Sequence, residues 1–229
     1  MVPTHVAIIP DGNRRWAREK GKGVMEGHEA GAEAFRAIAL HAADCGVKHL
    51  SVWGLSLENA KKRSLREMAG LMNIFRKQFM SLKESDDIHS RQVKINVFGW
   101  WQKQFPARVR HEIEAAISAT EHYSSYFLNF FLAYSGTNEM ALAIQNILRN
   151  PPAKVTDETI KHSLLTKDLP AVDLVIRTGG EPHLSAGFMM WDVADAELYF
   201  PEVHWPDFTP AEFDKALEFY ASRERRFGK

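Results

Sequence analysis

Apolar runs of strand length alternate along the chain with amphipathic stretches. The first run, residues 6–9, is apolar at every position, which is typical of a strand buried on both faces of a sheet. Further runs of this length predict five more strands. They lie at residues 47–53, 93–98, 126–133, 173–176 and 196–200.

Helices are predicted from spacing and from end signals. Apolar residues recur at helical spacing between residues 27 and 43. Ser64 with Glu67 forms a capping box for a second long helix, and Thr209 with Pro210 marks the start of the last one. Further helices are predicted at residues 106–122 and 138–148. This alternation indicates an α/β fold, a mostly parallel six-stranded sheet flanked by helices.

Composition narrows the class of protein. The chain has 229 residues, 45% of them hydrophobic, and no repeat or linker divides it, so we predict a single domain over residues 1–229. Lys+Arg and Asp+Glu both number 29, whereas a general nucleic-acid binder carries a basic excess. The single cysteine, Cys45, excludes an intrachain disulfide and a multi-cysteine metal site. Without a signal peptide or a spanning apolar run, the expected location is cytoplasmic.

Polar clusters follow several of the predicted strands, where open parallel sheets bind their ligands. The first cluster, residues 11–16, reads DGNRRW. Gly12 lets backbone N–H groups approach an anion, and Arg14 and Arg15 can fork onto phosphate oxygens. Asp11 would repel phosphate unless a hard cation such as Mg²⁺ lay between them. The alternative interpretation is a solvated turn with an Asp–Arg pair.

Two more clusters have related chemistry. Residues 56–59, SLEN, follow the second strand and lead into a basic run, in which a solvated face is the favoured interpretation for Lys61 and Arg63. Residues 177–185, RTGGEPHLS, suit phosphate but lack the Lys-Ser/Thr of a P-loop. A further cluster, residues 134–139, is interpreted as a strand-to-helix turn with an N-cap. Motifs of zinc peptidases, α/β-hydrolases and nicotinamide enzymes are absent from the sequence.

Six segments together resemble the cis-prenyltransferases, of which undecaprenyl diphosphate synthase is the best-known type. In the family's order, over residues 5–228, they are HVAIIPDGNRRWA, GHEAGAEAF, SLEN, DLVIRTGGE, AELYFPEVHWPDF and RERRFG. The resemblance implies a Mg²⁺-dependent homodimer that joins isopentenyl diphosphate to an allylic diphosphate such as farnesyl or geranyl diphosphate. Pyrophosphate is released and a Z double bond is made. It also implies a hydrophobic tunnel, and a long product would favour transient membrane contact.

The resemblance assigns roles by position. Asp11 corresponds to the acid that handles Mg²⁺ and the allylic diphosphate, and Asn59 to the residue usually given as proton acceptor. Glu197 corresponds to a second metal ligand, which in the family comes from the dimer partner's side or near it. The RERRFG tail is similar to a stretch that reaches a site across the dimer. Matches to substrate-binding positions are Gly12, Asn13, Arg14, Arg15, Trp16, His28, Ser56, Leu57, Glu58, Lys62, Arg177, His183, Leu184 and Ser185.

Other positions depart from the family pattern. Val24, Lys62 and His183 stand where arginines are usual, and Ala60 where tryptophan is usual. These changes keep two alternatives open: a non-catalytic partner subunit, and an atypical short-chain prenyl-coupling enzyme. Tunnel candidates, with ordinary core packing as the alternative for each, are Phe75, Phe79, Phe127 and Leu132.

Overall fold

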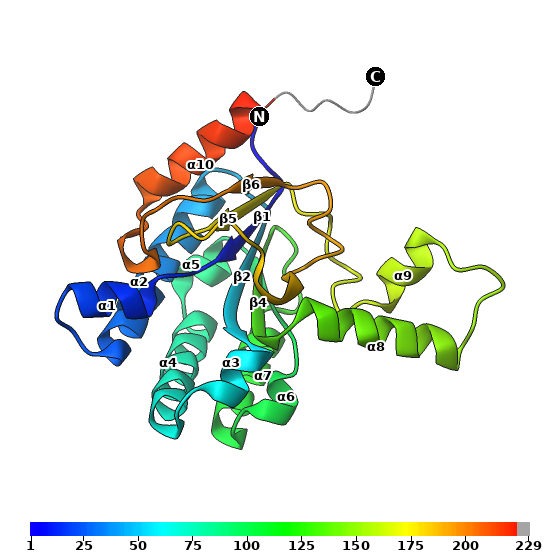
Figure 1. Cartoon of the computed structure of the whole chain (residues 1–229), viewed down its shortest axis with the longest axis horizontal. Coiled ribbons are helices and arrows are strands. Elements are labelled where there is room, and N and C mark those ends of the chain that lie inside the picture. Colours follow the sequence, from blue (N-terminus) through cyan, green and yellow to red (C-terminus); the bar gives the residue numbers. More distant parts are fainter. Residues whose placement is uncertain (224–229) are drawn as a thin grey trace.

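The computed structural model describes residues 1–223 and shows one six-stranded sheet in the order β3-β4-β2-β1-β5-β6 (Figure 1). Every neighbouring pair is parallel, so the predicted parallel α/β sheet is confirmed. The strands are β1 (His5–Ile9), β2 (His49–Ser56), β3 (Val93–Phe98), β4 (Tyr126–Tyr134), β5 (Leu174–Arg177) and β6 (Glu197–Tyr199).

Helices connect the strands in the manner of a parallel sheet. The α-helices are α1 (Asn13–Glu19), α2 (Val24–Asp44), α3 (Leu57–Lys62), α4 (Leu65–Lys83), α5 (Asp86–Ser90), α6 (Trp101–Gln104), α7 (Ala107–Thr120), α8 (Gly136–Arg149), α9 (Asp157–Ser163) and α10 (Pro210–Ser222). Two short 3₁₀ turns, η1 (Ser185–Gly187) and η2 (Trp205–Asp207), lie in the C-terminal part. Within residues 1–223, no helix is long and apolar enough to cross a bilayer.

The buried side chains form two clusters on opposite faces of the sheet. Val6 and Ile8 of β1 belong to the larger cluster, which contains residues of α2, α4, α7 and α10. Ala7 and Ile9 point the other way, into a smaller cluster with Phe188 and neighbouring loop residues. The long helices therefore gather on one face, and the buried loop residues that cover the other face lie between residues 169 and 193.

Element boundaries differ from the sequence-based expectation where local contacts decide them. β3 spans the predicted residues, whereas β2 runs on to Ser56 and α2 begins at Val24. The backbone N–H of Gly23 donates to the Glu26 carboxylate at 2.7 Å, which caps α2 early. The helices α1, α3, α5, α6 and α9 were not predicted, because one or two turns carry too little periodicity.

The helices α8 and α9 extend from the body as an arm (Figure 1). Ser135 is the N-cap of α8, as the turn interpretation of residues 134–139 expects: its hydroxyl accepts from the Asn138 backbone at 3.4 Å. Glu139 is buried at the base of the arm, where it accepts from the Tyr134 hydroxyl and from the Thr166 backbone N–H. This carboxylate ties α8 to the sheet and to the return loop.

Candidate active site

The carboxyl ends of β1 and β5 bring two predicted clusters into contact. Ile9 and Arg177 are partners in the register of these strands, and Asp11 follows two residues after Ile9. Arg177 Nη2 donates to Asp11 Oδ2 at 2.7 Å. The Thr178 hydroxyl fixes the backbone of Asp11 by accepting from its N–H at 2.9 Å and donating to its carbonyl at 2.7 Å.

Arg177 organises the loop that follows β5. It is only 4% exposed, and its Nη1 donates to the His183 carbonyl at 2.7 Å and to the Ser185 hydroxyl at 2.6 Å. Its Nε is buried, and no partner for it lies among residues 1–223. A buried guanidinium with a spare donor is suited to a phosphate oxygen.

Arg15 links Asp11 to the glycine-rich loop. Its Nη2 lies 3.3 Å from Asp11 Oδ1, and its Nη1 lies 3.3 Å from Glu181 Oε1. Gly179 has φ of +85°, and a Cβ there would collide with the Arg15 guanidinium. A glycine is therefore required here both for the left-handed backbone and for the close approach of the arginine.

A cavity of about 440 Å³ opens beside these residues, between the ends of β1, β2 and β5. It brings together most of the predicted polar positions. The predicted site residues that line it are Asp11, Ser56, Glu58, Asn59, Arg177, His183, Leu184 and Ser185. Ser56 also caps α3, because its hydroxyl accepts from the Asn59 backbone N–H at 2.9 Å.

Arg63 is a residue of this cavity that the sequence interpretation missed. A solvated face is wrong for it: its side chain is 17% exposed, and its Nη1 lies 3.2 Å from Glu67 Oε1 and 3.5 Å from His28 Nε2. Burial lowers the pKa of Arg63. Lys61 is exposed as expected. Lys62 is 72% exposed, pairs with Glu58 on the surface and does not line the cavity.

An apolar cavity adjoins the polar one. It measures about 130 Å³ and shares Trp53, Gly54 and Arg63 with the first. His28 lines it and is buried against Glu67, with 3.1 Å between Nε2 and Oε1, and burial lowers the pKa of His28. Two tunnel candidates, Phe75 and Phe79, lie in its wall.

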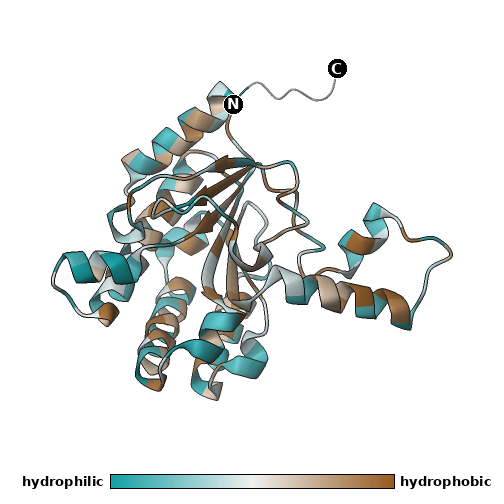
Figure 2. Cartoon of the chain, viewed as in Figure 1, coloured by the Kyte–Doolittle hydropathy of each residue, from teal (hydrophilic) through white to brown (hydrophobic). Residues whose placement is uncertain are grey.

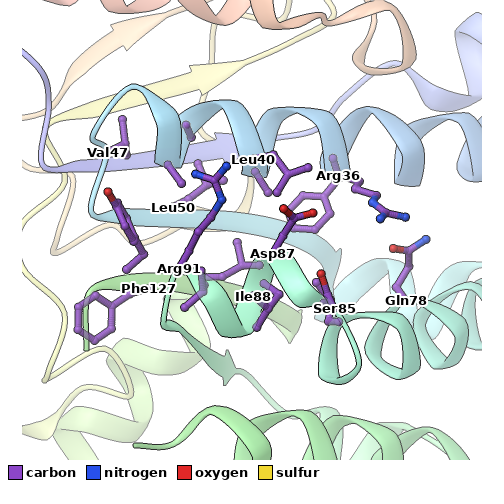
Figure 3. Close-up of a pocket in the computed structure, with 18 of the residues that line it drawn as sticks. Arg36, Leu40, Val47, Leu50, Gln78, Ser85, Asp87, Ile88, Arg91 and Phe127 are labelled. Carbon is purple, nitrogen blue, oxygen red and sulfur yellow. The ribbon is translucent and has the colours of Figure 1, made fainter. Parts of the chain in front are cut away.

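A third, smaller pocket of about 60 Å³ lies between α2, α4 and α5 (Figure 3). It shares Phe35 and Gln78 with the apolar cavity and contains the tunnel candidate Phe127. The fourth tunnel candidate, Leu132, packs against Gly54, which lines both the polar and the apolar cavity. The described residues thus form neighbouring cavities, and a continuous tunnel stays a prediction.

The remaining residues of the first cluster, and Leu57, lie in different environments. Gly12 has φ of +107° and packs against His204, so it is required for the turn. Trp16 and Leu57 are buried. Arg14 is exposed at the start of α1, yet close enough for its charge to lower the pKa of His28 and Arg63. Asn13 lines the apolar cavity.

Glu197 is not brought to this site within one chain. It opens β6, where its register partner Leu174 is in turn paired with Val6. Asp11 lies five residues beyond Val6, or about 16 Å along the strand direction. Glu197 Oε2 instead lies 3.8 Å from Arg223 Nε. Apart from Arg223, the RERRFG tail lies outside the described residues.

Asp11 fits the requirements of a divalent cation bound together with phosphate. Mg²⁺ commonly uses one or two carboxylates plus substrate phosphate oxygens. The Asp11 side chain is one-third exposed to the cavity, and its present partners, Arg15 and Arg177, are themselves phosphate ligands by chemistry. One carboxylate for the cation, beside guanidinium groups for the phosphate, suits a site that binds the two together.

The fold and the site define a parallel α/β protein that can hold a phosphorylated apolar molecule, with the phosphates among arginines and the apolar part in the adjoining cavity. Residues 9–228 match the family described as "Putative undecaprenyl diphosphate synthase". The chain belongs to this family of prenyl transferases, a class that generally needs a divalent metal.

Individual relatives match over essentially the whole of this chain. An undecaprenyl-diphosphate synthase of Thermococcus kodakarensis, named as geranylgeranyl-diphosphate specific, is 38% identical over 100% of this chain and 88% of its own. One of Pasteurella multocida, named as farnesyl-diphosphate specific, is 36% identical over 99% of this chain and 95% of its own. The crystal structure of lavandulyl diphosphate synthase from Lavandula x intermedia, in complex with dimethylallyl diphosphate, gives a TM-score of 0.93 at 31% identity, covering 100% and 99% of the two chains. The predicted family is confirmed.

Proposed function

We propose that this protein is a Mg²⁺-dependent Z-prenyl diphosphate synthase that condenses isopentenyl diphosphate with an allylic diphosphate. The observation that carries the proposal is the contact between Asp11 and Arg177 in a cavity that also contains Asn59 and Ser185. The names of the relatives specify farnesyl or geranylgeranyl diphosphate, which supports a polyprenyl product.

The residues divide between two diphosphates. Asp11 and Arg63, which line the polar cavity, would hold the allylic diphosphate, with Arg15 beside Asp11 and Arg14 adding positive charge nearby; the apolar chain would enter the cavity beside His28. Isopentenyl diphosphate would lie against the face of Arg177 that lines the cavity and against His183, Leu184 and Ser185. As the allylic C–O bond breaks, negative charge collects on the leaving pyrophosphate, and the guanidinium groups stabilise it.

A bound Mg²⁺ would neutralise part of the leaving-group charge. The chain's own contribution is the Asp11 carboxylate, held in place by Arg177 and by the Thr178 hydroxyl. Glu197 would act as a further ligand only when a second protomer brings it to the site.

The isopentenyl unit then forms the new C–C bond and loses a proton. Asn59 lines the cavity, but an amide is a poor base, so we assign it the positioning of a proton route that ends on the released pyrophosphate. The apolar walls, with Trp53 and Phe75 among them, keep water from the cation-like allylic carbon.

The arm supports a homodimer. Ile144 and Leu148 of α8 and Val155 beyond it are exposed, and Figure 2 shows hydrophobic residues on the outer half of α8, away from the sheet. A second protomer would cover this apolar surface. A single catalytic domain over residues 1–229 and a cytoplasmic location complete the proposal.

Incubation with labelled isopentenyl diphosphate, Mg²⁺ and a panel of allylic diphosphates tests the function. We expect butanol-extractable label with farnesyl or geranylgeranyl diphosphate. If none of the allylic primers in the panel gives labelled product, the synthase proposal is refuted and the partner-subunit alternative remains. A competing function is the coupling of two allylic diphosphates; the likeness to a synthase that binds dimethylallyl diphosphate favours testing it, and a condensation product from dimethylallyl diphosphate alone would establish it.

A further inference from the structure

Three metal-ligating side chains converge where the last helix crosses the end of α2. His41 lies in the last turn of α2, Cys45 is the C-cap residue that follows this helix, and Asp214 faces them from α10. His41 Nε2 lies 2.6 Å from Asp214 Oδ1 and 3.5 Å from Cys45 Sγ, which in turn lies 3.9 Å from Asp214 Oδ1. The cluster lies at the opposite end of α2 from His28, and neither cavity of the candidate active site contains any of its residues.

These separations approach those around a tetrahedral zinc ion. With Zn–S near 2.3 Å and Zn–N or Zn–O near 2.0–2.1 Å, tetrahedral ligand atoms lie roughly 3.3–3.6 Å apart. The His41–Cys45 and Cys45–Asp214 distances are close to this range. The His41–Asp214 distance is shorter because a direct hydrogen bond joins the two side chains, and it would open when a cation is inserted.

A nucleophile relay does not explain the arrangement. In a relay, the nucleophile and the carboxylate contact opposite nitrogens of the imidazole. Here Cys45 and Asp214 both approach the same nitrogen, Nε2 of His41. Three ligand atoms that meet at one point are the geometry of a metal centre. Phe213 packs edge-on against the His41 ring, with centroids 6.1 Å apart, and so holds the imidazole in this orientation.

The chemistry of the donors selects the ion. A thiolate and a carboxylate carry two negative charges beside a neutral imidazole, which balances a divalent cation. Sulfur and nitrogen ligands favour Zn²⁺ and related transition ions, whereas Mg²⁺ takes oxygen ligands. The Asp11 site offers a carboxylate but no sulfur, so the two sites differ in the ions they prefer.

We propose that His41, Cys45 and Asp214 form a binding site for Zn²⁺ or a similar transition-metal ion, with water as the fourth ligand, that clamps α10 to α2. Both helices contribute to the same hydrophobic cluster, through Ile38 and Phe213 among others. The ion would add a polar link at the edge of that packing and would fix the helix from which the C-terminal tail continues.

Cobalt(II) titration of the full chain tests the site, because Cys45 is the only cysteine. We expect one Co²⁺ per chain, with a thiolate-to-cobalt charge-transfer band and the intense visible absorption of tetrahedral cobalt, both removed by equimolar Zn²⁺. Cys45→Ser should lose the charge-transfer band, and His41→Ala should weaken binding at least ~10-fold, since even outer-shell changes cost that much. Zn²⁺ should raise the Tm of the wild type but not of Cys45→Ser.

Two controls separate this site from others. Asp11→Asn should keep the cobalt spectrum, because it removes only the oxygen site. His111→Ala, at an exposed histidine on α7, should bind as the wild type does. A wild type without a thiolate band, a band that survives Cys45→Ser, or a stoichiometry of one ion per two chains would overturn the proposal. None of these outcomes depends on prenyl transfer, so failure here and failure of the proposed function are distinct.

Discussion

Arg63 and Lys62 are adjacent basic residues that the structure places in opposite environments. Arg63 lines both the polar and the apolar cavity, and its Nε is buried with no partner among residues 1–223. Lys62 points to solvent and pairs with Glu58. If the cavity holds the allylic diphosphate, Arg63→Gln should impair the reaction and Lys62→Gln should not.

The expected fall in kcat/KM follows from the hydrogen-bond donors that each side chain can offer to phosphate. The guanidinium has five N–H donors, and the recorded contacts with Glu67 and His28 use only its Nη1. One charged hydrogen bond to phosphate contributes about 1.5–3 kcal/mol. At about 1.36 kcal/mol per decade, its loss corresponds to roughly a 10- to 150-fold fall in kcat/KM. The Lys62–Glu58 pair is exposed and screened by solvent, so its loss should have little effect on stability or on the reaction.

The assay is the steady-state rate of labelled isopentenyl diphosphate incorporation as the allylic diphosphate is varied. Arg63→Lys should recover part of the loss, because it keeps the charge but not the fork. Thermal unfolding of each variant checks that the Arg63–Glu67 contact is not simply needed for folding. Equal losses in the two glutamine variants, or a larger loss in Lys62→Gln, would refute the placement of Arg63 in the site.

Three further predictions concern stability and product size. Burial lowers the pKa of His5 from 6.5 to about 4. As pH falls, this histidine therefore takes up a proton in the unfolded chain before it does so in the folded one, which lowers the free energy of unfolding. In urea titrations, wild type should lose about 2 kcal/mol more of this free energy between pH 7 and 5 than His5→Gln does. Equal losses in the two proteins would argue against this. Gly54→Val should shorten the products seen by mass spectrometry, since a Cβ there lies 2.8 Å from Leu132 Cδ2, whereas unchanged products would place the growing chain elsewhere. Glu139→Ala should lower the Tm, because it leaves the Tyr134 hydroxyl and the Thr166 N–H without an acceptor. Each unpaired donor costs about 1–3 kcal/mol of stability, and an unaltered Tm would mean that water replaces the carboxylate.

The His5 prediction rests on a buried network whose polarity can be deduced. The Pro170 carbonyl can only accept, so His5 Nδ1 donates to it at 2.9 Å. His5 Nε2 is then left to accept from the Ser51 hydroxyl at 2.7 Å, and Ser51 accepts from Asn129 at 3.2 Å. Burial lowers the pKa of His5 chiefly because the charged ring would lose its hydration, and a protonated Nε2 could no longer accept from the Ser51 hydroxyl.

The sequence was most informative where chemistry follows directly from a strand. Continuous apolar runs predicted the parallel strands, and the rule that ligands bind beyond their carboxyl ends placed Asp11 and Arg177 at one edge. The two residues are 166 positions apart and form an ion pair in the structure. Their contact follows from the register of β1 with β5, in which Ile9 is paired with Arg177; a run that is apolar at every position does not specify that register, so only the structure shows it.

Sequence reasoning failed where packing of separate elements decides. Arg63 precedes the N-cap Ser64, and whether it faces solvent or a cavity depends on how α4 packs against α2. Glu197 is a different case: the register of β6 separates it from Asp11 within one chain, and its expected role as a ligand from or near the dimer partner's side stays a prediction. The three ligands of the proposed metal site include one 169 residues from Cys45, and no local motif joins them.

The central claim is that the cavity at the carboxyl ends of β1 and β5 is a diphosphate site that depends on the Asp11 carboxylate. Its most direct test compares wild type with Asp11→Asn, an isosteric change, for Mg²⁺-dependent incorporation of isopentenyl diphosphate. The account predicts that the variant keeps the wild-type circular dichroism spectrum but loses turnover at every Mg²⁺ concentration. A folded Asp11→Asn variant with near-normal kcat would contradict it.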